Sequence, residues 1–159
     1  MEPMKESSNV TRLPGAEDIR LREPPHNFEA EQALLGAILI NNAAYQRVAE
    51  FLRPEHFADP LHGKLFDSLS RLIERGQIVS AVTLKTYVEQ DEDMKAAGGA
   101  TYLARLAAAS VHVIDAAAFG QAVHDLYLRR QLIDLGEGVV NGAFGGDVDD
   151  TALAQIETA

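Results

Sequence analysis

Apolar residues recur every three or four positions along most of the sequence, which is the spacing that gives a helix one buried face. The pattern is clearest between Pro60 and Gly76. Strand-like alternation is confined to two short pieces, IVSAV at 78–82 and VHVI at 111–114. The sequence therefore predicts an all-α fold.

Polar residues mark the starts of several predicted helices. Asn27, Asp59 and Asp115 suit N-cap positions, and Ser80 is a further cap with Val79 and Leu84 spaced as a hydrophobic staple. Glycines mark helix ends, as in the acidic run EQDEDMKAAGG, which closes on a double glycine. The predicted helices cover residues 28–40, 44–52, 60–75, 80–88 and 101–108, then a long segment that Asp115 opens and NGAFGG closes, and finally TALAQIETA.

Changes in composition predict three regions. Residues 1–25 mix charges with Ser, Asn and Pro and have no apolar period, so we expect a disordered leader. Residues 26–110 are expected to form a compact bundle of short helices. Residues 111–159 are expected to form a two-helix hairpin whose second helix is incomplete.

Composition and charge narrow the classes of protein. The chain has 159 residues, no cysteine and a net charge of −10, which excludes thiolate metal sites and cysteine nucleophiles. From residue 26 onward, ten Lys and Arg accompany nineteen Asp and Glu, so the basic face that DNA phosphates need is missing. With neither a signal peptide nor an apolar run of about 18 residues, a soluble cytoplasmic protein is expected.

Searches for catalytic, cofactor and metal motifs find no site. GEGVVNG at 136–142 follows a predicted helix, and HGKL at 62–65 lacks the rest of a phosphate loop. The nearest metal-like group is His56, Asp59 and His62, which we interpret as polar residues of an ordinary loop, a metal-dependent helical enzyme being the weaker alternative.

Two glutamates open the first predicted helix. Because residues two apart on a helix point about 200° away from each other, Glu29 and Glu31 cannot converge on one substrate or metal. We therefore assign both glutamates to the helix dipole, as acidic residues of the first turn. Tyr102 and Phe119 fit a core better than a contact surface, and Gly36 fits close helix packing. An interaction module is favoured over an enzyme.

Five ordered blocks of sequence carry a family resemblance. They are PPHNFEAEQALLGAIL at 24–39, PEHFADPLHGKLFDSL at 54–69, GQIVSAVTL at 76–84, GGATYLARL at 98–106 and FGQAVHDLYLRRQLI at 119–133. In this order the blocks resemble the N-terminal domain of the bacterial replicative DNA helicase, the DnaB family. Phe119 departs from the family's usual tyrosine, and AAASVHVIDAAA replaces a loop that often contains proline.

The resemblance implies a scaffold without catalytic residues of its own. Family hairpins pair within a hexameric ring, and a RecA-like motor domain, absent here, binds ATP and Mg and contacts DNA. The domain also docks the C-terminal helicase-binding domain of primase, and a helicase loader is a further candidate partner. The family's primase contacts correspond to Glu29, Tyr102, Ile133 and Val139. The alternative is an unrelated helical adaptor, for example a loader or regulator. With its second hairpin helix incomplete, the chain is expected to be monomeric or weakly dimeric.

Overall fold

The computed structural model describes residues 22–110, 115–146 and 151–159, and within these ranges it contains helices and no strand. The predicted all-α fold is therefore confirmed. The elements are α2 (Phe28–Ile40), α3 (Ala43–Gln46), the 3-10 helix η1 (Pro54–His56), α4 (Pro60–Glu74), α5 (Lys85–Gln90), α6 (Glu92–Ala96), α7 (Ala100–Ala109), α8 (Ala116–Gly145) and α9 (Ala152–Thr158).

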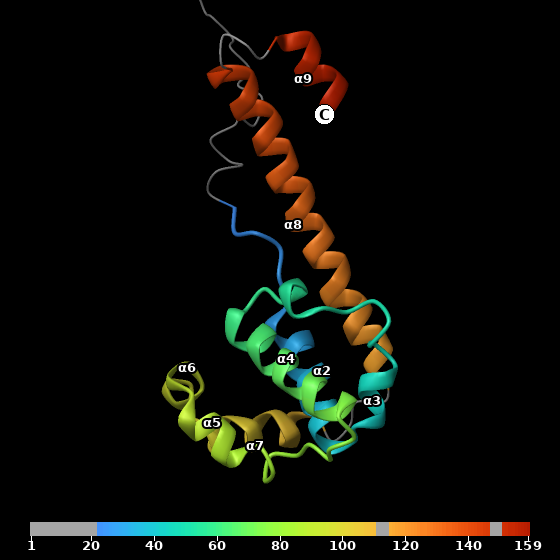
Figure 1. Cartoon of the computed structure of the whole chain (residues 1–159), viewed down its shortest axis with the longest axis vertical. Coiled ribbons are helices and arrows are strands. Elements are labelled where there is room, and N and C mark those ends of the chain that lie inside the picture. Colours follow the sequence, from blue (N-terminus) through green and yellow to red (C-terminus); the bar gives the residue numbers. More distant parts are fainter. Residues whose placement is uncertain (1–21, 111–114, 147–150) are drawn as a thin grey trace, which may run out of the picture.

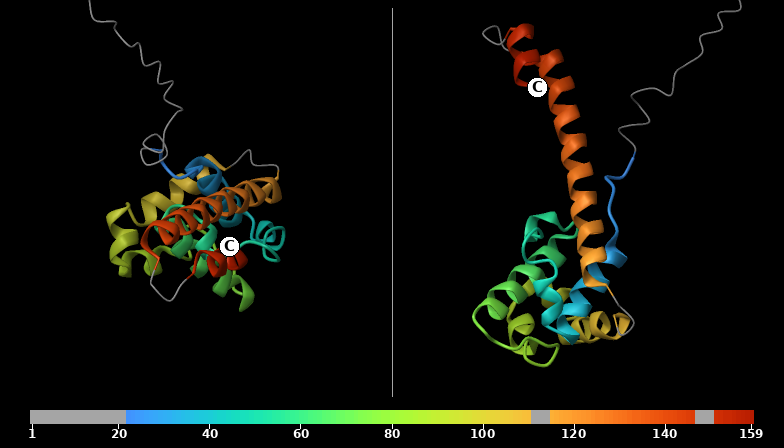
Figure 2. Two further views of the ribbon diagram at one scale, coloured as in Figure 1. Left: turned by 90° about the horizontal axis from the view of Figure 1, so that it is seen from above. Right: turned by 90° about the vertical axis from the view of Figure 1, so that its right-hand side faces the viewer.

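The helices form a globule and an arm. Helices α2 to α7 gather into the globule, and the first turns of α8 pack on it (Figure 1). The rest of α8 projects away, and α9 returns beside its far end (Figure 2). The predicted leader at 1–25 falls mostly outside the described residues, so that prediction stays open.

Helix α2 is the central element of the core. Most of its circumference is apolar, so it can pack against α4, α7 and α8 on different sides. Gly36 permits the contact with α7, because a Cβ at this position would clash with the Leu106 carbonyl and the Ser110 hydroxyl. The most deeply buried large apolar side chains are Leu34, Leu35, Ile38, Leu52, Leu65, Phe66, Leu69, Leu84, Met94 and Leu103.

Three predicted N-caps are confirmed. The Asn27 carboxamide oxygen accepts from the Ala30 amide at 2.9 Å, and the Asp59 carboxylate accepts from the Leu61 amide at 2.9 Å. Asp115 caps α8 by accepting from the Ala118 amide at 3.1 Å. Gly76 ends α4 with a φ of 78°, which only glycine adopts freely.

The segment between α4 and α7 differs from its prediction. Ser80 does cap, since its hydroxyl accepts from the Thr83 amide at 3.2 Å, but regular helix starts only at Lys85. Helix α6 was not predicted. Asp91 begins it by accepting from the Asp93 and Met94 amides, each at 3.1 Å, and buried Met94 fastens it to the core.

Candidate functional site

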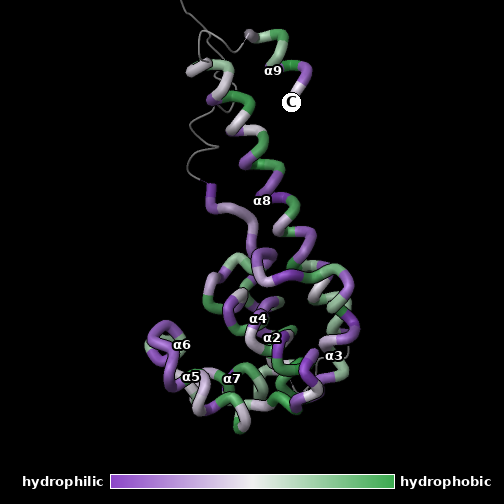
Figure 3. Tube along the Cα trace, viewed as in Figure 1, coloured by the Kyte–Doolittle hydropathy of each residue, from purple (hydrophilic) through white to green (hydrophobic). Residues whose placement is uncertain are grey.

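The projecting part of α8 carries apolar side chains that the described residues leave largely exposed. Of the 30 residues of α8, only Gly120 and Val123 are buried. Leu128, Leu132, Leu135 and Val139 are all exposed and are spaced four, three and four residues apart. That alternation is the heptad spacing of helices that pair with another helix. Apolar positions recur along this part of α8 (Figure 3).

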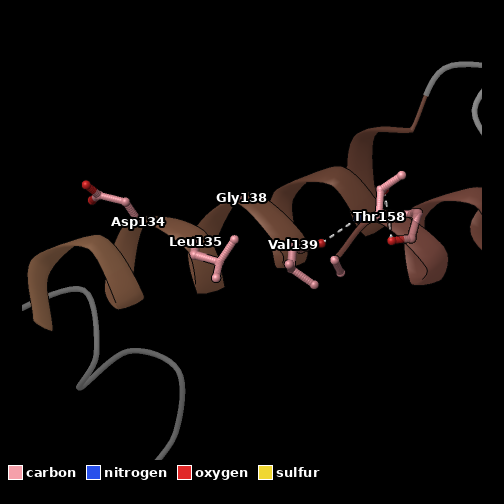
Figure 4. Close-up of a pocket in the computed structure, with 7 residues that line it drawn as sticks. Asp134, Leu135, Gly138, Val139 and Thr158 are labelled. Carbon is pink, nitrogen blue, oxygen red and sulfur yellow. Dashed lines mark hydrogen bonds between the residues drawn. The ribbon is translucent and has the colours of Figure 1, made fainter. Parts of the chain in front are cut away.

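Helix α9 covers only one end of this apolar stripe. The Gln155 side-chain amide donates to the Val139 carbonyl at 2.8 Å, and its amide group lies over Gly142. A hollow of about 340 Å³ lies between the two helices (Figure 4), lined by Asp134, Leu135, Gly138, Val139, Gln155, Thr158 and Ala159. On α9 itself, Leu153 and Ile156 are exposed. The predicted pair of helices thus presents apolar groups on both members.

A second hollow lies where α8 leaves the globule. Its volume is about 230 Å³, and it is lined by Pro24, Glu55, Phe57, Ala58, Tyr127, Arg130, Gln131, Ile133 and Asp134. Arg130 connects its walls, because its guanidinium donates to the carbonyls of Pro25 and His56, each at 2.8 Å. An aliphatic side chain, Ile133, and charges of both signs therefore border one concave surface.

Inside the globule, a buried polar network joins three helices. The Glu31 carboxylate lies 2.6 Å from His62 Nδ1, and His62 Nε2 lies 2.6 Å from the Tyr102 hydroxyl. Glu31 also accepts from the Ala58 and Asp59 amides at 2.6 and 3.3 Å. Burial raises the pKa of Tyr102, so its hydroxyl remains protonated and able to donate.

This network corrects the assignment of Glu31. Its side chain is only 2% exposed, so it is not simply a solvated partner of the helix dipole. Glu29 and Glu31 do point apart, because Glu29 is exposed while Glu31 is buried. The partner of Glu31 comes from another helix, α4. Neither Glu31 nor His62 carried a sequence signal for this contact.

The two histidines of the metal-site alternative contact different residues. His62 faces Glu31 and Tyr102, whereas the ring of His56 packs against His124 and Tyr127 of α8. Among the residues that the structure describes, no group of three or more His, Cys, Asp or Glu could hold a metal ion. The interpretation of these histidines as local polar contacts fits their observed partners.

The four residues expected to contact primase lie on three helices and differ in exposure. Glu29 is exposed at the start of α2, whereas Tyr102 is 9% exposed and is hydrogen-bonded to His62. Ile133 and Val139, which are 39% and 38% exposed, lie on α8 and border different hollows. The side chain of Tyr102 thus belongs to the core, and sequence reasoning did not single out Leu128, Leu132 or Leu135.

None of the helices within the described ranges combines the length and apolarity that a membrane crossing requires.

Comparison with known proteins identifies relatives of the chain. The family described as "DnaB-like helicase N terminal domain" matches residues 23–125. The "Replicative DNA helicase DnaB" of Rickettsia prowazekii (strain Madrid E) is 44% identical over 135 residues, which are 85% of this chain and 28% of that protein. This chain thus spans less than a third of that relative's length.

Two solved structures share the fold. The crystal structure of the N-terminal domain of DnaB helicase from Mycobacterium tuberculosis matches with a TM-score of 0.77 and 29% identity, over 86% of this chain and 94% of that one. A DnaB-like replicative helicase, whose structure was described with its interactions with primase, matches with a TM-score of 0.62 and 24% identity. That match covers 84% of this chain and 35% of the other.

Proposed function

Since this chain belongs to the family of DnaB-like helicase N-terminal domains, we propose that it is the scaffold part of a hexameric replicative DNA helicase, where it pairs subunits and docks primase. The family match disfavours the alternative of an unrelated helical adaptor. Binding of ATP and Mg, and most contacts with DNA, we assign to the part of the relatives that this chain does not match. A helicase loader is a further proposed partner, and the cytoplasm is the proposed location.

The apolar stripe on α8 carries the proposal that subunits pair. Its members repeat with heptad spacing and are exposed over several turns. Pairing with a second copy of the α8 and α9 helices would bury them, and burial of apolar surface contributes about 25 cal/mol per Å². The hollow beside α9 leaves Leu135 and Val139 within reach of such a partner.

Sedimentation over a series of protein concentrations tests pairing. We expect a weak dimer, which Leu132→Glu converts to a monomer because a charge cannot be buried in the stripe without a partner. Ile78→Glu is the matched control, since Ile78 is also exposed but lies on the globule. Equal association of both variants would contradict pairing through the stripe, and a stable hexamer of this chain would contradict the expected weak dimer.

Primase docking is supported by the helicase whose structural description includes primase, and by the surface of α8. Ile133 borders the 230 Å³ hollow together with Arg130 and Asp134. An aliphatic anchor with charged groups at its rim is typical of a transient interface. Val139 and Glu29 are exposed enough for direct contact, whereas Tyr102 would act indirectly, by positioning His62 and the α7 surface.

Calorimetry with the C-terminal helicase-binding domain of the cognate primase tests docking. We expect Ile133→Ser to weaken binding about tenfold, and Glu29→Lys to weaken it less, because a rim charge contributes little. Val82→Ser is the control, as Val82 is an exposed apolar residue of the globule. Unchanged affinity of the Ile133→Ser variant would remove this residue from the interface, and absence of binding by the folded chain would refute docking.

A further inference from the structure

A cluster of rings and cations fastens α8 to the globule. The His56 ring in η1 lies with its centroid 4.8 Å from that of His124 and 4.5 Å from that of Tyr127, both on α8. Phe51 also packs against His124, with 5.9 Å between the ring centroids. Arg130 completes the cluster by donating to the His56 carbonyl at 2.8 Å. We call these five residues the α8 joint.

The hydrogen bonds of His56 define its protonation state. The backbone amide of Arg53 donates to His56 Nδ1 at 3.0 Å. Because a backbone amide can only donate, Nδ1 must accept, and the single ring proton of His56 is therefore on Nε2. A second proton would place two N–H groups against each other. The observed geometry thus requires neutral His56.

The charges around His56 also oppose its protonation. His124 and Arg130 face it from α8, and Arg53 lies beside it in its own segment, while exposed Glu55 favours the charged form. The Tyr127 ring also packs against His56. His56 itself is 8% exposed. Burial, followed by the neighbouring charge of His124, lowers the pKa of His56 below its ordinary value.

We propose that the α8 joint is an acid-sensitive hinge, in which protonation of His56 breaks the contact between α8 and segment 53–58. When the contact is broken, His56 is solvated and titrates near its ordinary value of about 6.5. The open state therefore binds more protons than the closed one, so the closed state loses stability as the pH falls through that value.

After the joint opens, α8 stays attached to the globule through residues nearer its N-terminal end. Val123 is buried in the core, and Gly120 lies against Val48. These contacts contain no titratable group, so acid does not remove them. The arm then changes its angle on the globule while both parts stay helical. This inference does not depend on the proposed function, because it concerns contacts within one chain.

Distance measurements between two spin labels test the hinge. Since the sequence contains no cysteine, Ala104→Cys on α7 and Ala143→Cys on the arm provide unique attachment sites, and both positions are exposed. We expect one narrow distance distribution at about pH 7.5 and a distribution about twice as wide at about pH 5.5. An equal width at both pH values, with His56 shown to be protonated at the lower one, would overturn the proposal.

Substitution of His56 separates its role from that of other titrating groups. The Asn side chain in His56→Asn can still accept from the Arg53 amide but cannot become charged, so the distribution should stay narrow at both pH values. A pH response equal to that of the unsubstituted chain would assign the effect to another group and refute the hinge. A second variant, His124→Phe, retains a ring but removes one of the charges that disfavour protonated His56 in the closed state. Protonation then destabilises the closed state less, so widening should require a lower pH.

An NMR titration of the unsubstituted chain keeps the test independent of any variant. The hinge requires the Nε2–H tautomer of His56 at neutral pH, and a midpoint for His56 below its ordinary value of about 6.5. Protonation of Nδ1 at neutral pH, or a midpoint for His56 above about 6.5, would refute the hinge.

Discussion

The globule and the arm of this chain are built on opposite principles. In the globule, α2 is covered on nearly all sides, and no buried side-chain nitrogen or oxygen of the described residues lacks a hydrogen-bond partner. In the arm, most of α8 has solvent where the globule has neighbouring helices. The globule therefore contains the contacts that stabilise it, whereas the arm has apolar surface that the described residues leave exposed.

The largest expected difference between the two regions is in the loss of stability when a leucine is replaced by alanine. Leu34→Ala in α2 should lower the free energy of unfolding by about 4 kcal/mol, because it removes a fully buried side chain and leaves a cavity. Leu132→Ala in α8 should change it by less than about 0.5 kcal/mol, because Leu132 is exposed. Urea titration of both variants measures the contrast, and similar values would mean that the arm is as well packed as the globule.

A larger side chain where two helices approach closely should lower the free energy of unfolding by nearly as much. Gly36→Ala should cost about 3 kcal/mol, because the added methyl clashes with the Leu106 backbone and forces α2 away from α7. The same urea titration measures this cost. A loss below about 1 kcal/mol would show that α7 can move aside, and that the core is less tightly specified than its burial implies.

The two glutamates of α2 provide a third test, within one turn of one helix. Glu31→Gln should cost about 2 kcal/mol, since the neutral amide cannot replace the carboxylate against His62 and the Ala58 and Asp59 amides. Glu29→Gln should be nearly neutral because Glu29 is exposed. Thermal unfolding followed by circular dichroism separates them, and equal effects would refute the buried network as a source of stability.

Local signals predicted much of this fold. Each N-cap at Asn27, Asp59 and Asp115 depends on residues within one turn, so a single segment is enough to recognise it. The segments of the polar network, in contrast, are brought together by folding: Glu31 meets His62, and His62 meets Tyr102, across long stretches of sequence. No periodicity reports such contacts. Glu31 does lie in the first turn of α2, but its burial against His62 was therefore not predicted.

The candidate site was predictable to a similarly limited degree. The resemblance pointed to Ile133 and Val139, which are partly exposed on α8, and also to Tyr102, which the fold encloses. Helical period alone could not distinguish the apolar stripe of the arm from a core-facing stripe. That distinction depends on whether another helix lies opposite, which is a property of the tertiary structure.

The smallest expected effect concerns Gly136, which lies on the arm within α8. A Cβ at this position would meet no atom within 4 Å, so packing within the chain does not require glycine here. Because alanine is favoured over glycine inside a helix by about 0.5–1 kcal/mol, Gly136→Ala should stabilise the far part of α8 and leave the globule unchanged. Slower amide exchange confined to the neighbouring turns of α8 would verify this, and slower exchange throughout the globule would contradict the separation of the two regions. Sedimentation of the same variant sharpens the comparison further: weaker dimerisation despite a more stable helix would mean that Gly136 is needed where a second chain approaches the arm, as Gly36 is needed where α7 approaches α2.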